Sequence, residues 1–456
     1  MNTSIRGILT AAAIMLTLPS TPSARLPQTA AAPTPAQGDS LARLADEVAK
    51  EVEGLRGWKF KRPVRKARIS LPDARRDIRN MLLSSEPPDR RARVQAVLRV
   101  AGLIPPDCDL LATSLAVLEQ QVAGYYEPRS RTLKLVDRAT PMPAFVQRMI
   151  LSHELTHALD DQHIDLEKLM RPGATEDADF VATSLGEGSA TALMLQEMVA
   201  AQKSGRFNMA DLSLYVAEEL ERARTLEELP RYFSAMFGSY ILGAAFLAKG
   251  ELPTLLTMPD DREIGRNLLI ARRALPRSSE QILHAEKYWD PARRDEPVLI
   301  DDRAVERWLA RRGRFVVHRD TLGELLTAIL TEPKGAPREL ARLQSTAAWT
   351  NPGAEGWGGD RFYLLAAGTS QEDAARSLKG LQGVWVTAWD SLKERDEFLA
   401  ALEKGSPPPG AVAAPVEGRV AVVFIGIDPA ERRALTGRLN TAPLLMTKDG
   451  RPWTGY

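Results

Sequence analysis

The sequence His-Glu-Leu-Thr-His-Ala-Leu-Asp-Asp-Gln-His runs from His153 to His163 and contains three of the five histidines of the chain. On a helix, residues four positions apart lie on the same face, so His153 and His157 can present two imidazole nitrogens to one zinc ion. Glu154 lies one step around the helix, beside the open coordination position, where a carboxylate can act as general base. The stretch therefore predicts a helix that carries two ligands and the base of a zinc site.

A third ligand has to come from elsewhere, and the first of two alternatives is His163. It lies ten residues after His153, which is the spacing of the third histidine in the metzincin motif. That motif has a glycine where this chain has Asp160, because the chain must turn out of the helix there. The match to this ligand pattern is therefore incomplete.

Glu187 is the second alternative and the one we favour. Its neighbours at helical spacing are mainly apolar, and a carboxylate on such an inward face is costly unless it is paired or bound to metal; they are Phe180, Thr183, Ala190, Met194 and Met198. Gly186 and Gly188 flank Glu187. Because glycine weakens a helix, these two residues predict the close approach of another element.

Composition limits the classes of protein that the chain can belong to. Its 456 residues are 44% hydrophobic and 26% charged, which is typical of a globular protein with more than one core. The formal net charge of +1 argues against a nucleic-acid-binding protein, which needs a basic face. Cys108 is the single cysteine, so neither an intramolecular disulfide nor a cysteine-rich metal site can form. Any metal must be held by His, Asp or Glu.

The N-terminus has the pattern of a secretory signal peptide over residues 1–24. An arginine at position 6 precedes an apolar run over residues 7–18, which is too short to span a bilayer, and small residues and prolines follow. Residues 25–38 are rich in Ala and Pro and are predicted to be a linker. We therefore expect an exported protein, periplasmic or secreted.

The rest of the chain predicts an α+β fold in two domains. Residues 39–335 form a mostly helical domain with a small hairpin at 122–127 and 132–136, and residues 338–456 form a smaller α+β domain. Apolar residues recur at helical spacing in eight segments of the first domain, namely 41–55, 72–83, 90–103, 110–122, 144–160, 176–203, 212–226 and 231–248. In the second domain, strands are expected at 362–367, 384–388 and 420–427, and helices at 392–402 and 429–439. Residues 232–248 carry no charge, and we interpret them as a core helix because a membrane span usually needs more residues.

With these motifs in place, the chain resembles the zincin metallopeptidases and, among them, the gluzincins. It is also similar to a group of little-characterised exported bacterial proteins in three further elements between residues 124 and 288, which are 160–163 (DDQH), 187–190 (EGSA) and 278–284 (SSEQILH). The tail segments 357–360 and 389–391 resemble that group too. The resemblance implies an exported Zn²⁺-dependent peptidase acting on a protein or peptide substrate, with His153, His157 and Glu187 as metal ligands and Glu154 as base.

Other residues near the predicted metal site would have to orient the ligands, pair with the substrate and stabilise the oxyanion. Many gluzincins have an Asp four residues after the glutamate ligand, and this chain has Thr191 there. Either Asp161 or Asp165 orients the ligand imidazoles instead, or the zinc is held more weakly. The strand at 132–136 either pairs with substrate, as the cleft strand of zincins does, or belongs to the core. Residues that could donate a hydrogen bond to the oxyanion are His284, Tyr125, Tyr126 and Tyr240.

A function of another class stays open at this point. The protein could be a non-catalytic envelope protein with a structural zinc site and a tryptophan-rich tail that binds a partner. A structural site is closed by four protein ligands, so His163 would have to join the other three.

Overall fold

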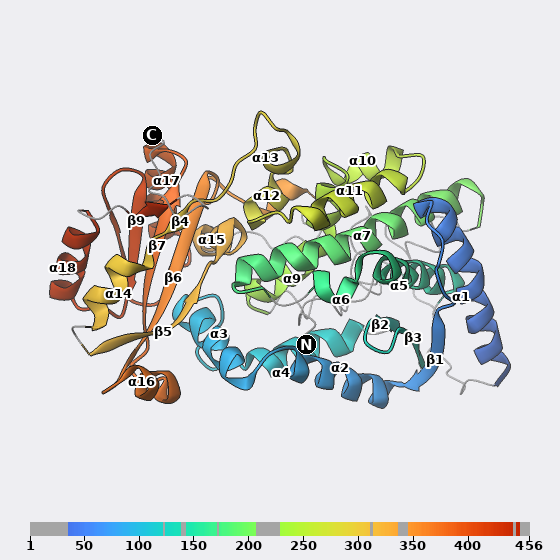
Figure 1. Cartoon of the computed structure of the whole chain (residues 1–456), viewed down its shortest axis with the longest axis horizontal. Coiled ribbons are helices and arrows are strands. Elements are labelled where there is room, and N and C mark those ends of the chain that lie inside the picture. The colour runs from blue at the N-terminus through green and yellow to red at the C-terminus, as the bar shows by residue number, and fades with distance from the viewer. Residues whose placement is uncertain are drawn as a thin grey trace.

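The computed structural model describes residues 35–121, 124–137, 143–170, 173–206, 229–310, 313–335, 345–440 and 444–446. The predicted fold class is confirmed, because a helical N-terminal part adjoins a C-terminal part built on a sheet. Figure 1 shows the two parts at opposite ends of an elongated molecule, with the sheet on the left. The predicted signal peptide lies outside the described residues, and the first helix begins at Pro35, inside the predicted linker.

The helical part contains seven of the eight helices that the periodicity predicted, together with several short ones. They are α1 (Pro35–Arg56), α2 (Leu71–Ser85), α3 (Pro88–Val100), α4 (Leu110–Gln121), α5 (Ala144–Ile164), α6 (Leu166–Leu169), α7 (Glu176–Lys203), α9 (Arg231–Leu247), α10 (Leu252–Thr257), α11 (Arg262–Arg273), α12 (Ser279–Leu283) and α13 (Glu286–Trp289). The helix predicted at 212–226 lies outside the described residues. None of the helices in the described ranges combines the length and the hydropathy that a membrane crossing requires. Helix α9, the uncharged stretch, packs against α7 in the core.

A three-stranded sheet lies beside these helices. The predicted hairpin is present as β2 (Gly124–Glu127) and β3 (Thr132–Asp137), and a further strand, β1 (Arg65–Ser70), pairs parallel with β3. The order is β1-β3-β2, so β3 is the central strand and β2 is an edge. Strand β1 was not predicted, because the stretch Arg-Lys-Ala-Arg-Ile-Ser lacks the alternation of a half-buried strand.

The C-terminal part is built on a five-stranded antiparallel sheet of order β5-β6-β7-β9-β8. Its strands are β5 (Arg314–Asp320), β6 (Trp357–Ala367), β7 (Gln382–Trp389), β8 (Ala411–Pro415) and β9 (Val420–Ile425). A separate pair joins β4 (Leu299–Ile300) to β10 (Leu445–Met446). The helical elements here are α14 (Asp302–Ala310), α15 (Gly323–Thr331), the 3₁₀ helix η3 (Thr346–Trp349), α16 (Gln371–Ser377), α17 (Leu392–Lys404) and α18 (Pro429–Leu439).

The boundary predicted between residues 335 and 338 needs correction. Strand β5 precedes this boundary and pairs along its length with β6, which follows it. Charged residues on α14 and β5 concealed this pattern, because both elements expose part of their surface. The sheet also packs against the helical part, since Val97 of α3 shares a core cluster with Phe362 and Leu364 of β6. The two parts therefore share one continuous core.

The tryptophans of the C-terminal part are core residues. Trp349, Trp357, Trp385 and Trp389 are all buried, and Trp389 stacks on Phe398 with ring centroids 4.6 Å apart. Trp453 lies outside the described residues. The four buried tryptophans cannot form the partner-binding surface that the non-catalytic interpretation assigned to them.

The close approach that Gly186 and Gly188 predicted is confirmed. A Cβ atom on Gly188 would collide with the backbone of Gly243 in α9, and one on Gly243 would collide with the carbonyl oxygen of Ser184 in α7. A Cβ on Gly186 would collide with the side chain of Met170. The backbones of α7 and α9 therefore touch at the turn of α7 that carries Glu187.

We expect Gly243→Ala to destabilise the protein by about 2 kcal/mol or more, because neither backbone can move away without disturbing the core. The matched control is Gly54→Ala in α1, where a Cβ has open space and where alanine stabilises a helix by up to about 1 kcal/mol. Urea unfolding followed by circular dichroism measures both changes. Equal stability of the two variants would show that α7 and α9 are not in backbone contact.

Candidate metal centre

The first two predicted ligands lie on α5, a helix in the middle of the helical part. Every residue of α5 from Met149 to Asp160 is buried, so the helix has no polar face over this stretch. The core therefore surrounds three residues of the motif: His153 is 0% exposed, Glu154 is 4% exposed and His157 is 6% exposed. Glu154 does not lie in solvent, as it would on an ordinary amphipathic helix.

Helix α7 brings the third predicted ligand to the same place. Glu187 is fully buried, and the small residues around it, including Gly186, Gly188 and Ser189, let neighbouring helices approach. Its Oε2 atom lies 3.2 Å from Nε2 of His153 and 3.3 Å from Nε2 of His157. The two imidazole Nε2 atoms are 3.0 Å apart. Three donor atoms from two helices thus form a compact, nearly equilateral triangle.

The charges of this triangle are strongly coupled. Burial favours a neutral imidazole on His157, but the Glu187 carboxylate outweighs it and raises the pKa of His157 to about 9. Burial lowers the pKa of His153 to about 4. Burial disfavours the Glu187 carboxylate, yet the two histidines lower its pKa to about 2. Without metal, the triangle therefore holds one carboxylate and one proton shared by the imidazole pair.

Glu154 is held by β2, an edge strand of the small sheet. Its Oε2 atom accepts a hydrogen bond of 2.7 Å from the backbone N–H of Tyr126 in β2. Burial raises the pKa of Glu154 to about 7, against the lowering effects of His157 and of the Tyr126 N–H. A carboxyl group with such a pKa can both accept and return a proton near neutral pH.

A buried arginine that the sequence analysis missed joins the two ligand helices. Arg56, at the end of α1, donates to Asp160 of α5 at 2.7 Å and to the hydroxyl of Ser189 in α7 at 3.0 Å. The Ser189 hydroxyl in turn donates to Asp160 at 2.6 Å, and Arg56 also pairs with Asp261. Arg56 resembles any surface arginine at the end of an amphipathic helix, so the sequence carried no signal for this role.

His163 lies away from the triangle. It stacks on Trp58 with ring centroids 4.8 Å apart, and its Nε2 atom lies 2.9 Å from the carbonyl oxygen of Lys59. The structure therefore brings Glu187, and not His163, to His153 and His157. The four-ligand set of a closed structural site is not assembled by these residues.

The aspartates expected behind the ligands make other contacts. Asp161 accepts from the Tyr126 hydroxyl at 2.8 Å, and Asp165 caps α6 by accepting from Lys168 N–H. Within the described part of the chain, Nδ1 of His153 and of His157 has no hydrogen-bond partner. The expectation that Asp161 or Asp165 orients the imidazoles is wrong for the described contacts, because neither accepts a hydrogen bond from an imidazole Nδ1.

The four residues proposed as oxyanion donors separate in the structure. Tyr240 of α9 is buried and stacks on His153 with ring centroids 5.9 Å apart. The hydroxyls of Tyr125 and Tyr126 donate to Asp77 and Asp161, and His284 lies 2.9 Å from Glu324. Tyr240 is therefore the one of the four that contacts a predicted ligand.

The role of substrate strand cannot belong to β3. This strand is paired on both sides, with β1 and with β2, so it has no free edge for another chain. The edge strand beside Glu154 is β2, whose Tyr126 N–H already reaches the carboxylate. Of the two interpretations of residues 132–136, the core strand is the one that the pairing supports.

Comparison with known proteins gives one partial match. Residues 312–419 match a family model described as a domain of unknown function, DUF8575. The match begins just before β5 and covers most of the large sheet, which agrees with the corrected boundary, and it does not include His153, His157 or Glu187. No curated protein and no solved structure matches the chain.

We expect zinc to release about one proton per ion when it binds at pH 7.5. The imidazole pair is protonated below a pKa of about 9, and zinc needs neutral imidazoles, so zinc affinity should fall about tenfold for each pH unit below 9. Isothermal titration calorimetry in buffers of different ionisation enthalpy measures the release. Zinc binding without proton release would show that both imidazoles are neutral in the free protein.

Proposed function

We propose that the protein is a zinc-dependent peptidase of the gluzincin type, with His153, His157 and Glu187 as zinc ligands and Glu154 as general base. The observation that carries the proposal is the triangle of Nε2, Nε2 and Oε2 atoms with sides of 3.0–3.3 Å. Tetrahedral ligands at about 2.0–2.1 Å from zinc are about 3.3–3.4 Å apart, which is close to these separations. Two imidazoles and one carboxylate are also a ligand set that zinc peptidases use.

The number of ligands favours catalysis over a structural role. Among the described residues, the group that converges here has three members, and a catalytic zinc site keeps its fourth position open for water or substrate. Oε1 of Glu187 is buried without a hydrogen-bond partner in the described part of the chain. An unsatisfied buried carboxylate oxygen is costly, and a bound cation offsets that cost.

The chain's own residues supply the remaining chemistry. When bound, zinc acts as a Lewis acid that activates water and polarises a substrate carbonyl. Glu154 takes a proton at its carboxylate and returns it to the departing amine, which requires the carboxyl group to titrate near the working pH. The Tyr126 N–H holds this carboxylate in place.

The cellular setting belongs to the same proposal. The signal-peptide pattern of residues 1–24 supports export to the periplasm or beyond. The balanced charge of the chain supports a protein or peptide substrate over a nucleic acid.

We expect Glu154→Gln to bind zinc and to lose peptide hydrolysis by about 100- to 10 000-fold, because glutamine keeps the shape of the side chain and cannot accept the proton. The purified protein is incubated with peptides from a digested bacterial lysate, and new termini are counted by mass spectrometry. Glu355→Gln, a substitution of an exposed residue, is the matched control and should cleave as the wild type does. Full cleavage by zinc-loaded Glu154→Gln would remove Glu154 from the mechanism.

A further inference from the structure

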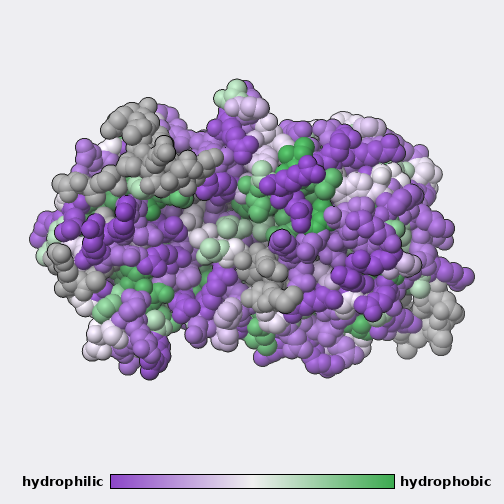
Figure 2. Space-filling view, viewed as in Figure 1, coloured by the Kyte–Doolittle hydropathy of each residue, from purple (hydrophilic) through white to green (hydrophobic). Residues whose placement is uncertain are grey.

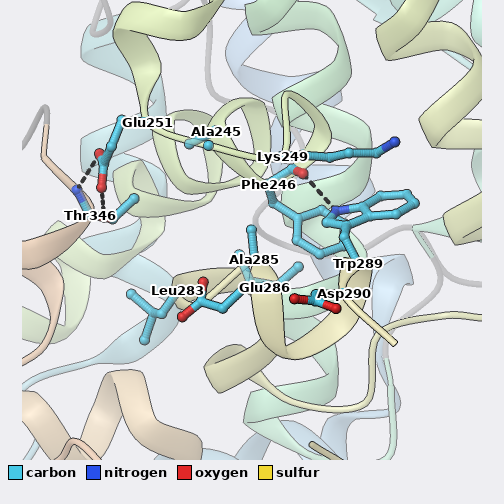
Figure 3. A pocket seen from close by; sticks show the side chains of 12 residues that line it. Ala245, Phe246, Lys249, Glu251, Leu283, Ala285, Glu286, Trp289, Asp290 and Thr346 are labelled. Carbon is cyan, nitrogen blue, oxygen red and sulfur yellow. Dashed lines mark hydrogen bonds between the residues drawn. The ribbon is translucent and has the colours of Figure 1, made fainter. Parts of the chain in front are cut away.

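A cavity of about 300 Å³ opens between the C-terminal end of α9 and the helices α12 and α13. The described residues that line it come from 245–251, from 282–290 and from Thr346 of η3, and they include none of the metal centre. Figure 3 shows the cavity from close by, and Figure 2 shows apolar residues exposed over the region of α11 and α12. A cleft of this size accommodates a small organic molecule or one side chain.

Aromatic side chains form one wall of the cavity. Phe246 and Trp289 lie with ring centroids 5.3 Å apart, and the indole N–H of Trp289 donates to the carbonyl oxygen of Phe246 at 2.8 Å. Tyr288 packs edge-on against Trp289 at 4.7 Å. These contacts fix the indole, so an apolar group meets a preformed surface.

The charged residues around this wall are mainly acidic. Glu251, Glu286 and Asp290 contribute three carboxylates against the single ammonium of Lys249. Glu251 accepts from Thr346. Asp290 accepts from the Ala292 N–H and makes an exposed ion pair of 3.6 Å with Arg293. Glu286 makes no ion pair or hydrogen bond through its carboxylate among the described residues, and its charge acts on the imidazole of His284. The C-terminal end of α9, which carries the negative end of the helix dipole, lies at the same cavity.

The protein's own lysine already uses the aromatic wall as a cation site. The ammonium of Lys249 lies 4.9 Å from the centre of the Trp289 ring and 3.9 Å from Glu263. A cation over a tryptophan face is attracted by the ring quadrupole. The wall therefore favours positive charge, and the carboxylates of Glu286 and Asp290 reinforce this preference.

We propose that the cavity binds an organic cation, an ammonium or guanidinium group on a short apolar stem. The stem lies against Phe246 and Leu283, and the cation lies between the carboxylates of Glu286 and Asp290. Two sources offer this chemistry, a free amine and the Lys or Arg side chain of a peptide. The proposal does not depend on the metal centre.

The first test is calorimetric titration of the full chain with three phenylalkyl probes of different charge. These are 2-phenylethylammonium, the neutral 2-phenylethanol and the anionic 3-phenylpropanoate. We expect the ammonium to bind at least tenfold more tightly than either analogue, and its affinity to fall at high salt. Equal affinities for the three probes, or no saturable binding of the ammonium, would overturn the proposal.

Variants locate the site. Glu286→Gln combined with Asp290→Asn should weaken binding of the ammonium probe at least tenfold, and Glu372→Gln, which changes an exposed carboxylate on α16, should leave it unchanged. Lys249→Ala should strengthen binding several-fold, because it frees the face of Trp289. Glu286 and Asp290 are not core residues, so an unchanged melting curve is expected as the folding control. Undiminished binding by the folded double variant contradicts the proposed site.

A last comparison separates the two sources. The tripeptide acetyl-Ala-Lys-Ala-amide is titrated beside the free amine and beside the same tripeptide with an acetylated lysine. Tighter binding of the lysine tripeptide than of the amine assigns the cavity to peptide side chains, and the reverse order assigns it to free amines. Equal binding of the acetylated tripeptide contradicts recognition of the cation.

Discussion

One buried guanidinium fixes the spacing of the two helices that carry the predicted metal ligands. Arg56 contacts Asp160, three residues after His157, and Ser189, two residues after Glu187. The Ser189 hydroxyl also donates to Asp160, so these three residues are all in contact with one another. Because the network is buried, loss of Arg56 leaves the carboxylates of Asp160 and Asp261 without this ion-pair partner in the core. The Arg56 network therefore holds α5 and α7 at the separation that brings the three predicted ligands together.

The centre of the helical part carries much buried charge for a protein core. Glu154, Glu187 and the two histidines are buried beside the Arg56 network, and the Nδ1 atoms of the imidazoles have no partner among the described residues. Polar groups in such positions cost stability unless they are paired or bind a ligand. The backbone contact between Gly188 and Gly243 offsets part of that cost, since it allows dense packing around Glu187. Close packing together with buried polar atoms that lack hydrogen-bond partners is typical of a ligand-binding site.

The sequence predicted the parts of the site that follow from local spacing. The four-residue separation of His153 and His157 is enough to place both on one face of α5, and the apolar stripe around Glu187 is enough to turn its carboxylate inward. Pairing between distant segments could not be predicted in the same way. Strand β1 is rich in charge and none of its residues is fully buried, so its parallel pairing with β3, which makes β3 central, had no sequence signal. Arg56 carried none either, because burial of an arginine depends on partners more than a hundred residues away.

The most direct measurement of the central claim is elemental analysis of zinc in the purified protein, with Glu187→Ala and His163→Ala beside the wild type. The convergence of Glu187 with His153 and His157 predicts about one zinc per chain in the wild type and in His163→Ala, and a large loss in Glu187→Ala. His163, which stacks on Trp58, should not matter. Zinc retained by Glu187→Ala and lost from His163→Ala, or no zinc in any sample after reconstitution, would contradict the account.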